Sequence, residues 1–283
     1  PFSYGNFDLG DYNKDSYIDI LTSGNDYSGN RATRIYFNDK NGKFTELDGT
    51  NFLGLLESHV QWNDYNNDGY LDIILAGSYT LGSTATVSTK LYKNNGDNTF
   101  SELAGIPIPA ASQNSFDWGD YDNDGKVDLV ITGFNTWGEG TIGEIFHNDG
   151  NDTFSEPFGI NFPKLYYSTV KWGDIDNDGD LDLFMMGKYF SDDLFTGIFR
   201  NNCIKTNNKP TVPSNLVSEV IEGQPQLSWD ISNDTETPSE AINYNIIVAS
   251  LPDTTIIKSP LADYKTGFLK VNTSSNLVYS TKY

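Results

Sequence analysis

Residues 120–128 read Asp120-Tyr121-Asp122-Asn123-Asp124-Gly125-Lys126-Val127-Asp128, an acidic stretch between two short apolar runs. Its acidic side chains occupy positions 1, 3, 5 and 9 of the stretch. Carboxylates gathered that closely would repel one another unless a cation lay between them. The stretch therefore predicts a loop that wraps around a calcium ion.

The same pattern occurs four times, at residues 11–19, 64–72, 120–128 and 174–182, which we call the first to fourth acidic loops. Their starting points are spaced by 53, 56 and 54 residues. A period near 54 residues is too long for most helical repeats and is typical of a four-stranded propeller blade.

Strand and turn signals recur in the same order within each unit. A short apolar strand precedes the acidic loop, and in three units it ends at Trp62, Trp118 or Trp172. Second strands rich in branched residues are expected over residues 18–24, 71–77, 127–133 and 181–187. Third strands are expected to end at Asn38, Asn94, Asn148 and Asn201. Gly-containing turns then lead to fourth strands at residues 43–46, 99–102 and 153–156.

The sequence thus predicts an all-β fold of antiparallel β-propeller blades. The fourth unit has no sequence for a fourth strand, because residues 201–209 are polar. Four blades could close a small ring. A larger ring with blades upstream of residue 1 is equally consistent with the sequence.

The four Asp-x-Asp/Asn-x-Asp-Gly/Ser-x-x-Asp loops, three with a preceding Trp, resemble the FG-GAP/VCBS repeats of integrin-alpha-type β-propellers. The form is that found in multimodular secreted bacterial proteins. The resemblance covers residues 1–209 and implies a calcium-binding propeller whose usual complete form has seven blades.

The resemblance implies about four Ca²⁺ ions, one in each loop. The side-chain ligands would be Asp11, Asn13, Asp15 and Asp19; Asp64, Asn66, Asp68 and Asp72; Asp120, Asp122, Asp124 and Asp128; and Asp174, Asp176, Asp178 and Asp182. Backbone carbonyls at loop position 7 would complete each set, from Tyr17, Tyr70, Lys126 and Asp180. Gly69, Gly125 and Gly179 supply the sharp turn at position 6. Ser16 stands there in the first loop and Leu9 replaces the Trp, so the first site is predicted to be the weakest.

A helical calcium hand needs an acid at position 12, where this chain has Thr22, Leu75, Ile131 and Met185 inside apolar strands. Solvated acidic turns that bind nothing are the remaining alternative. Extracellular sites bind calcium at about 10⁻⁴ to 10⁻³ M, so roughly millimolar calcium adds about 0.4 to 1.4 kcal/mol per site. The metal is therefore predicted to stabilise the fold and not to catalyse a reaction.

Composition limits the possible partners. The chain of 283 residues has 18 Lys and Arg against 39 Asp and Glu, a net charge of −21, which argues against nucleic acid and membrane insertion. Cys203 is the only cysteine, so neither an intrachain disulfide nor a zinc cluster is expected. His59 and His147 fall within expected strands and no catalytic motif accompanies them, so we predict that the chain is not an enzyme.

Exposed aromatic residues offer a candidate ligand face. Strand alternation places the second-to-third loops of the blades opposite the acidic loops. These loops carry Tyr27, Tyr79, Trp137, Tyr189 and Phe190, which could stack on sugar rings or grip a protein loop. The alternative is that the rings cover the blade edges.

Residues 210–283 resemble the front half of a fibronectin type III module, an incomplete β-sandwich. Strands are expected at residues 213–216, 227–230 and 244–248, with Trp229 as the core anchor. An unpaired edge there could recruit a strand from a neighbouring molecule.

These observations favour a calcium-stabilised adhesion or recognition module that binds a glycan or protein, with copies of itself as a further candidate partner. The chain opens inside a repeat, so we expect an export signal upstream and an extracellular or cell-surface location, in a bacterium. A non-catalytic module of a secreted polysaccharide-degrading enzyme, and a subunit of an extracellular filament or surface layer, are the alternatives.

Overall fold

The computed structural model describes residues 2–15, 17–80, 86–135, 140–156, 160–176, 178–203, 208, 210–221, 224–235, 242, 244, 248–249 and 256–258. Within this part of the chain every regular element is a β-strand, and no helix occurs, which confirms the all-β prediction. None of these residues forms a helix long and apolar enough to cross a membrane.

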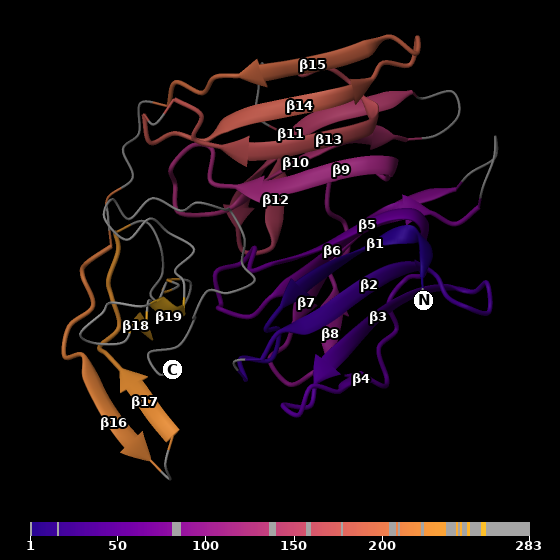
Figure 1. Ribbon diagram of the computed structural model, residues 1–283. Helices are drawn as coiled ribbons and strands as arrows, with labels where there is room; N and C mark the ends of the chain where they lie inside the picture. The colour runs from indigo at the N-terminus through magenta and orange to yellow at the C-terminus, as the bar shows by residue number, and fades with distance from the viewer. Residues whose placement is uncertain are drawn as a thin grey trace.

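Four antiparallel sheets are formed by strands that follow one another in sequence (Figure 1). The first blade contains β1 (Ser3–Gly10), β2 (Asp19–Asn25), β3 (Arg31–Asn38) and β4 (Phe44–Glu46). The second contains β5 (Leu56–Asn63), β6 (Asp72–Ser78), β7 (Val87–Asn94) and β8 (Phe100–Glu102). The third contains β9 (Ser112–Gly119), β10 (Asp128–Phe134), β11 (Thr141–Gly150) and β12 (Thr153–Ser155). The fourth contains β13 (Tyr166–Gly173), β14 (Asp182–Lys188) and β15 (Leu194–Phe199).

These bounds agree closely with the strands expected from the sequence. Each second strand begins and ends one residue later than predicted, and the fourth blade has three strands in the described residues, as expected. The turns between third and fourth strands place Gly42, Gly96 and Gly150 at φ of 80°, 77° and 78°, a left-handed conformation that glycine adopts without strain.

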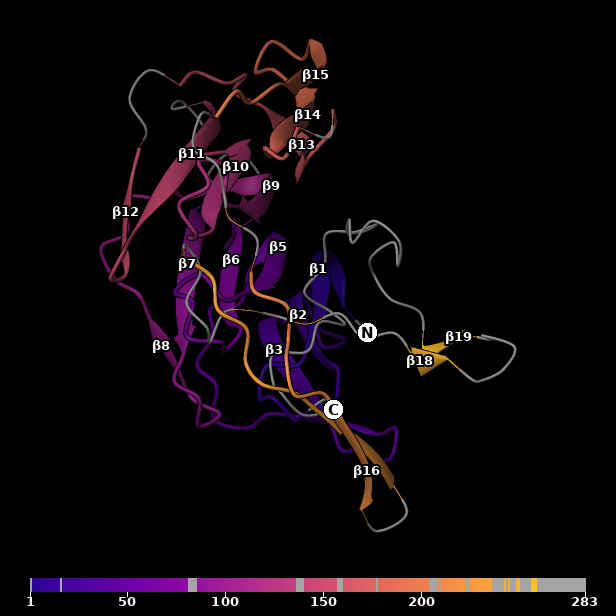
Figure 2. The same cartoon turned by 90° about the vertical axis from the view of Figure 1, so that its left-hand side faces the viewer.

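The blades are arranged as a fan around their first strands. β1 packs beside β5, β5 beside β9, and β9 beside β13. Figure 2 shows these four strands along the inner side of the fan, with β8 and β12 at its outer edge. This arrangement is that of consecutive β-propeller blades, and it brings the acidic loops of neighbouring blades together at one end.

The hydrophobic core lies between blades, in three contacts that we call seams. In the first seam Leu21 and Ile35 of the first blade pack against Trp62 and Leu75 of the second. The second and third seams combine the second with the third blade and the third with the fourth in the same way. Each blade is therefore stabilised by its neighbours more than by its own sheet.

The C-terminal part forms two hairpins, β16 (Val217–Ile221) with β17 (Gln224–Ser228) and β18 (Val248–Ala249) with β19 (Ile256–Lys258). The strand predicted at residues 213–216 is wrong, because Asn215 has a positive φ of 50° and the strand begins only at Val217. The predicted strands at 227–230 and 244–248 overlap β17 and β18 only at their ends. Trp229 packs against Ile242 and Tyr244, and the fibronectin-like sandwich stays a prediction.

Candidate functional site

The acidic loops share one pattern of internal hydrogen bonds. The carboxylate at position 1 accepts the backbone N–H of position 5 at 2.9, 3.0, 2.9 and 3.2 Å in the four loops. Its other oxygen accepts the N–H of Gly69, Gly125 and Gly179 at position 6, at 2.7, 2.8 and 3.2 Å. These glycines have φ of 82°, 88° and 98°, which confirms the predicted sharp turn. Ser16, at position 6 of the first loop, lies outside the described residues.

The position-9 aspartates are fully buried at the base of the loops. One oxygen of each accepts the N–H of the asparagine at the end of the third strand. The four donors are Asn38, Asn94, Asn148 and Asn201, at 2.8, 2.7, 2.8 and 2.9 Å. The second oxygens of Asp19 and Asp72 are buried and have no hydrogen-bond partner among the described residues. Because a buried carboxylate oxygen without a partner is costly, a cation at the base of these two loops would remove that cost.

Burial disfavours ionisation of these groups. Desolvation, reinforced by neighbouring carboxylates, raises the pKa of Asp19 to about 7 and of Asp72 to about 9. Burial likewise raises the pKa of Asp64 and of Asp128 to about 7. Because a divalent cation would favour the ionised carboxylates, these groups are poised to release protons when a metal binds.

The structure brings together the side chains of positions 1, 3 and 9. In the third loop one oxygen each of Asp120, Asp122 and Asp128 lies within 4.8 Å of the others, and Asp174, Asp176 and Asp182 do the same in the fourth loop. The first two loops have Asn13 and Asn66 at position 3, and their amide oxygens accept the N–H of Asp15 and Asp68.

These oxygen-only sets fit calcium, and the unpartnered oxygens of Asp19 and Asp72 supply the structural evidence for that fit. The position-5 carboxylates accept the position-7 N–H, at 2.9 to 3.0 Å in the three loops with Asp15, Asp68 and Asp124. The position-7 carbonyls stay predicted ligands.

A basic side chain also touches each acidic loop, which the sequence reasoning missed. Lys40 and Lys93 place their Nζ atoms 3.6 Å from position-5 carboxylates, and Arg200 contacts Asp176. The signal was present, because Lys93, His147 and Arg200 all directly precede the third-strand asparagine. These cations partly neutralise loops that were expected to depend on metal alone.

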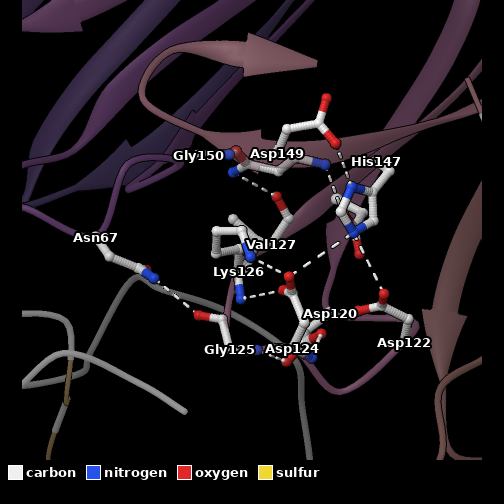
Figure 3. A network of polar contacts seen from close by, with 12 residues as sticks. Asn67, Asp120, Asp122, Asp124, Gly125, Lys126, Val127, His147, Asp149 and Gly150 are labelled. Atoms are coloured by element: carbon white, nitrogen blue, oxygen red, sulfur yellow. Dashed lines mark hydrogen bonds and ion pairs between the residues drawn. The ribbon is translucent and has the colours of Figure 1, made fainter. Parts of the chain in front are cut away.

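The third loop has the densest network of this kind (Figure 3). His147 Nε2 lies 3.2 Å from Asp122 Oδ2 and 3.7 Å from Asp124 Oδ2, and Nδ1 lies 2.9 Å from Asp149 Oδ1. Lys126 Nζ also contacts Asp124. Burial opposes a charge on His147, but these carboxylates prevail and raise its pKa. His147 therefore acts as a charge partner of the acidic loop.

Neighbouring loops are linked through their fourth residues, also unforeseen from the sequence. Asn67 Nδ2 donates to the Gly125 carbonyl at 2.8 Å, as Figure 3 shows, and Asn123 Nδ2 donates to Asp180 Oδ1 at 2.9 Å. Lys14 Nζ lies 3.9 Å from the centre of the Tyr70 ring. The loops therefore form a connected row across the seams.

Comparison with known families agrees with this geometry. The family described as FG-GAP-like repeat matches residues 11–75 and 64–131, which contain the first three acidic loops. The chain contains FG-GAP-like repeats. The fourth unit lies outside the matched residues, although its loop has the same hydrogen bonds.

Two solved structures are similar to the chain at 11% sequence identity. One, described as a complex of BT0996 and RGII, has a TM-score of 0.39, and the match covers 84% of the present protein and 89% of that structure. The other, described as "Glycoside hydrolase", has a TM-score of 0.35, and the match covers 81% of the present protein and 87% of that structure. No curated protein matches the sequence.

The predicted ligand-binding rings differ in exposure. Tyr27 and Phe190 are exposed, whereas Tyr79 and Tyr189 are half-buried against the cores of the first and third seams. Trp137 lies outside the described residues. At Tyr79 and Tyr189 the rings thus cover blade edges, the alternative considered for the whole set.

Phe190 belongs to a group of rings that we call the aromatic platform, formed with Phe134, Tyr166 and Tyr167 at the end of the third and fourth FG-GAP-like blades. The Phe134 ring stacks on Phe190 at 6.3 Å and meets Tyr166 edge-on at 6.1 Å, and Tyr166 lies 5.1 Å from Tyr167. The sequence reasoning missed three of these residues, because Phe134 and the two tyrosines stand in strands and not in the loops where ligand residues were sought.

Polar groups border the aromatic platform. The Tyr166 hydroxyl donates to Asp192 Oδ1 at 2.5 Å, and Gln113 Nε2 donates to the Tyr167 hydroxyl at 2.9 Å. Lys188 Nζ lies 3.5 Å from the same Asp192 oxygen. Rings bordered by carboxylate, amide and ammonium groups combine a stacking surface with hydrogen-bonding partners, a combination suited to sugar rings and to protein loops.

Proposed function

We propose that the chain is a calcium-stabilised, non-catalytic recognition module that binds a glycan or a protein through the aromatic platform. The exposed ring of Phe190, stacked on Phe134 beside Asp192, is the observation that carries the recognition role. The platform lies at the end of the blades opposite the acidic loops, since second-to-third connections and first-to-second connections leave a meander at opposite ends.

The calcium part of the proposal is supported by the four repeated loops and by the unpartnered buried oxygens of Asp19 and Asp72. The residues that would hold the ions are the position 1, 3, 5 and 9 side chains of each loop. A bound ion supplies positive charge at the base of each blade. Sites of about 10⁻⁴ to 10⁻³ M suit an extracellular or cell-surface location, where such affinities are used.

The histidines of the described part support a non-catalytic assignment. The His59 ring stacks on Phe116 at a centroid distance of 4.1 Å, and burial lowers its pKa to about 4. His147 is held by carboxylates of the third loop and by Asp149. Neither imidazole is thus positioned as a general base facing the platform. Membership of a larger polysaccharide-degrading enzyme stays a prediction.

Recognition is tested by screening the chain against arrayed glycans and surface proteins, with calcium and with EDTA. Replacing Phe190 by alanine should weaken any specific binding at least about tenfold, as expected for an aromatic anchor. The matched control is Phe44→Ala, an exposed ring on the outer strand of the first blade. Equal binding by all three proteins would refute the platform as the ligand site.

Calcium binding is tested separately by calorimetric titration of the metal-free chain. About four sites are expected, and Asp182→Asn should remove one of them. A titration without heat, together with unchanged thermal unfolding in EDTA, would refute the calcium assignment. The array screen decides recognition by the platform independently of that result.

A further inference from the structure

The two outermost blades each leave one apolar face uncovered. On the fourth blade Ile198 is 53% exposed, whereas Leu91 and Ile145, the residues at the same repeat position in the second and third blades, are 1% and 4% exposed. On the first blade Phe7 is 63% exposed, whereas Val60 and its counterparts are buried. These faces are the two halves of a seam that has not been formed.

Each internal seam contains a hydrogen bond that crosses from one blade to the other. The asparagine at the end of the third strand donates through Nδ2 to the position-2 carbonyl of the preceding acidic loop. The three bonds are Asn94 to Tyr12 at 2.9 Å, Asn148 to Tyr65 at 2.7 Å and Asn201 to Tyr121 at 2.5 Å. In the described part of the chain, Asn38 Nδ2 reaches only the Ile18 carbonyl of its own blade, at 3.4 Å.

Aromatic stacking also marks each internal seam. The position-2 tyrosine of one loop stacks on the first-strand tryptophan of the next blade, and the centroids lie 5.7, 6.4 and 6.1 Å apart. The two open halves have changed together at these positions. Ile175 replaces the tyrosine on the fourth blade and Leu9 replaces the tryptophan on the first, and both are exposed. An aliphatic pair fits where an aromatic pair stands elsewhere.

Charges on the open halves are complementary as well. The residue that precedes the tryptophan position lies next to its counterpart across a seam, since Lys171 Nζ is 2.7 Å from Asp117 Oδ1. Continuing that order past the fourth blade places Lys171 beside Asp8 of the first blade. Opposite charges would meet there, whereas two Lys or two Asp would repel.

From these matches we infer that the open face of the fourth blade binds the open face of the first blade of a second copy of this chain. The contact is head-to-tail, so two copies close into a ring of eight blades when both open faces pair. Asn38 then donates to the Ile175 carbonyl of the other copy, and Leu9 packs on Ile175. Eight blades lie within the usual range of about 4–8 for propellers.

Light scattering coupled to size-exclusion chromatography tests the ring on the 283-residue chain. The expected mass is twice the chain mass of 31.5 kDa at micromolar concentration. Phe7→Lys combined with Ile198→Lys should give one chain mass with an unchanged circular dichroism spectrum, since both side chains are exposed in the single copy. Phe44→Lys, on an outer strand, should leave the mass doubled. A single-chain mass for the unmodified protein at every concentration would overturn the inference.

Cysteine cross-linking tests the pairing of faces, in a Cys203→Ser background. Leu9→Cys mixed with Ile175→Cys should form a disulfide-linked pair of chains under mild oxidation, whereas neither variant alone should do so. Tyr27→Cys serves as the control, because Tyr27 is exposed and lies in the β2–β3 connection at the other end of the first blade. Cross-linking of Leu9→Cys with itself, or an unlimited ladder of masses, would overturn the head-to-tail ring. None of these outcomes depends on glycan or protein binding by the platform.

Discussion

Asp72 has one carboxylate oxygen bonded to the Asn94 N–H at 2.7 Å and a second buried oxygen without a partner in the described residues. Burial raises its pKa to about 9, with Asp64 and Asp68 adding to the effect. In the metal-free protein the related stability is complete below the ordinary pKa near 4 and falls as the pH rises toward 9, because the unfolded carboxyl ionises first. A bound cation removes that penalty.

Asp72→Asn should therefore have opposite effects with and without calcium. In EDTA at pH 7 it should raise the melting temperature, because a neutral amide replaces a group that must be protonated to be buried. With roughly millimolar calcium it should lower the stability by about 0.4 to 1.4 kcal/mol, the contribution of one lost site. Thermal melts under both conditions check this. Asp97→Asn, at an exposed turn, is the control and should behave alike in both.

His59 gives a pH dependence of the opposite kind. Its pKa is lowered to about 4 by burial, whereas an unfolded histidine titrates near 6.5. Its contribution is thus present above about pH 6.5 and is lost as the pH falls to about 4. At about 1.4 kcal/mol per pKa unit, the loss is about 3 kcal/mol.

His59→Phe should abolish that contribution while keeping a ring against Phe116. The difference in unfolding free energy between the native chain and the variant, measured by denaturant titration from pH 7 to 4, should change by up to about 3 kcal/mol in the variant's favour. A constant difference across this range would show that His59 charges freely in the folded state.

At the scale of the strand, a bulge accounts for the glycine that recurs near the end of each second strand. The paired first strand shifts register there, and its residues Tyr4, Glu57, Gln113 and Tyr167 have φ of 53°, 46°, 46° and 42°. The bulge brings the first-strand backbone close to the glycine. A Cβ on Gly77 would lie 2.7 Å from the Leu56 carbonyl oxygen.

Gly77→Ala should accordingly destabilise the chain, by about 1–3 kcal/mol, because one strand must shift to relieve the clash. Gly173→Ala is the matched control, since Gly173 also lies in a strand but a Cβ there meets nothing within 4 Å. Chemical denaturation compares the two. An equal effect of both substitutions would rule out close approach as the reason for glycine at position 77.

At the scale of the molecule, the core consists of seams between blades, so the same repeat position has different energetic weight in different blades. Trp62 is buried against Tyr12, Leu21 and Ile35 of the preceding blade. Leu9 occupies the same position in the first blade, but its face is open.

Trp62→Ala should cost about 3–5 kcal/mol, as expected for removing a buried aromatic side chain. Leu9→Ala should change the stability of the single chain by less than about 1 kcal/mol, because half-exposed side chains lose little burial. Urea unfolding at a concentration where chains do not associate measures both. Similar losses at the two positions would contradict the assignment of the core to the seams.

The repeating blades could be predicted from the sequence because their signals are local. Alternating strands, Gly-containing turns and acidic loops depend on residues near one another in the chain. For the same reason the loop carboxylates, the turn glycines and the missing fourth strand of the last blade were all placed correctly. The strand at 213–216 was misplaced because a positive φ at Asn215 cannot be read from residue type.

By itself the sequence determined the blade repeat, the acidic loops and the end of the blades from which ligand residues should project. Only the tertiary structure decided which residues meet across seams: Lys93 and His147 with the loop carboxylates, Phe134 with Phe190, and the open halves bearing Ile198 and Phe7. Such contacts join residues distant in the sequence or depend on a neighbour's packing, and no local period specifies them. The acidic stretch at residues 120–128 therefore identifies a blade, whereas packing between blades determines what its surroundings contact.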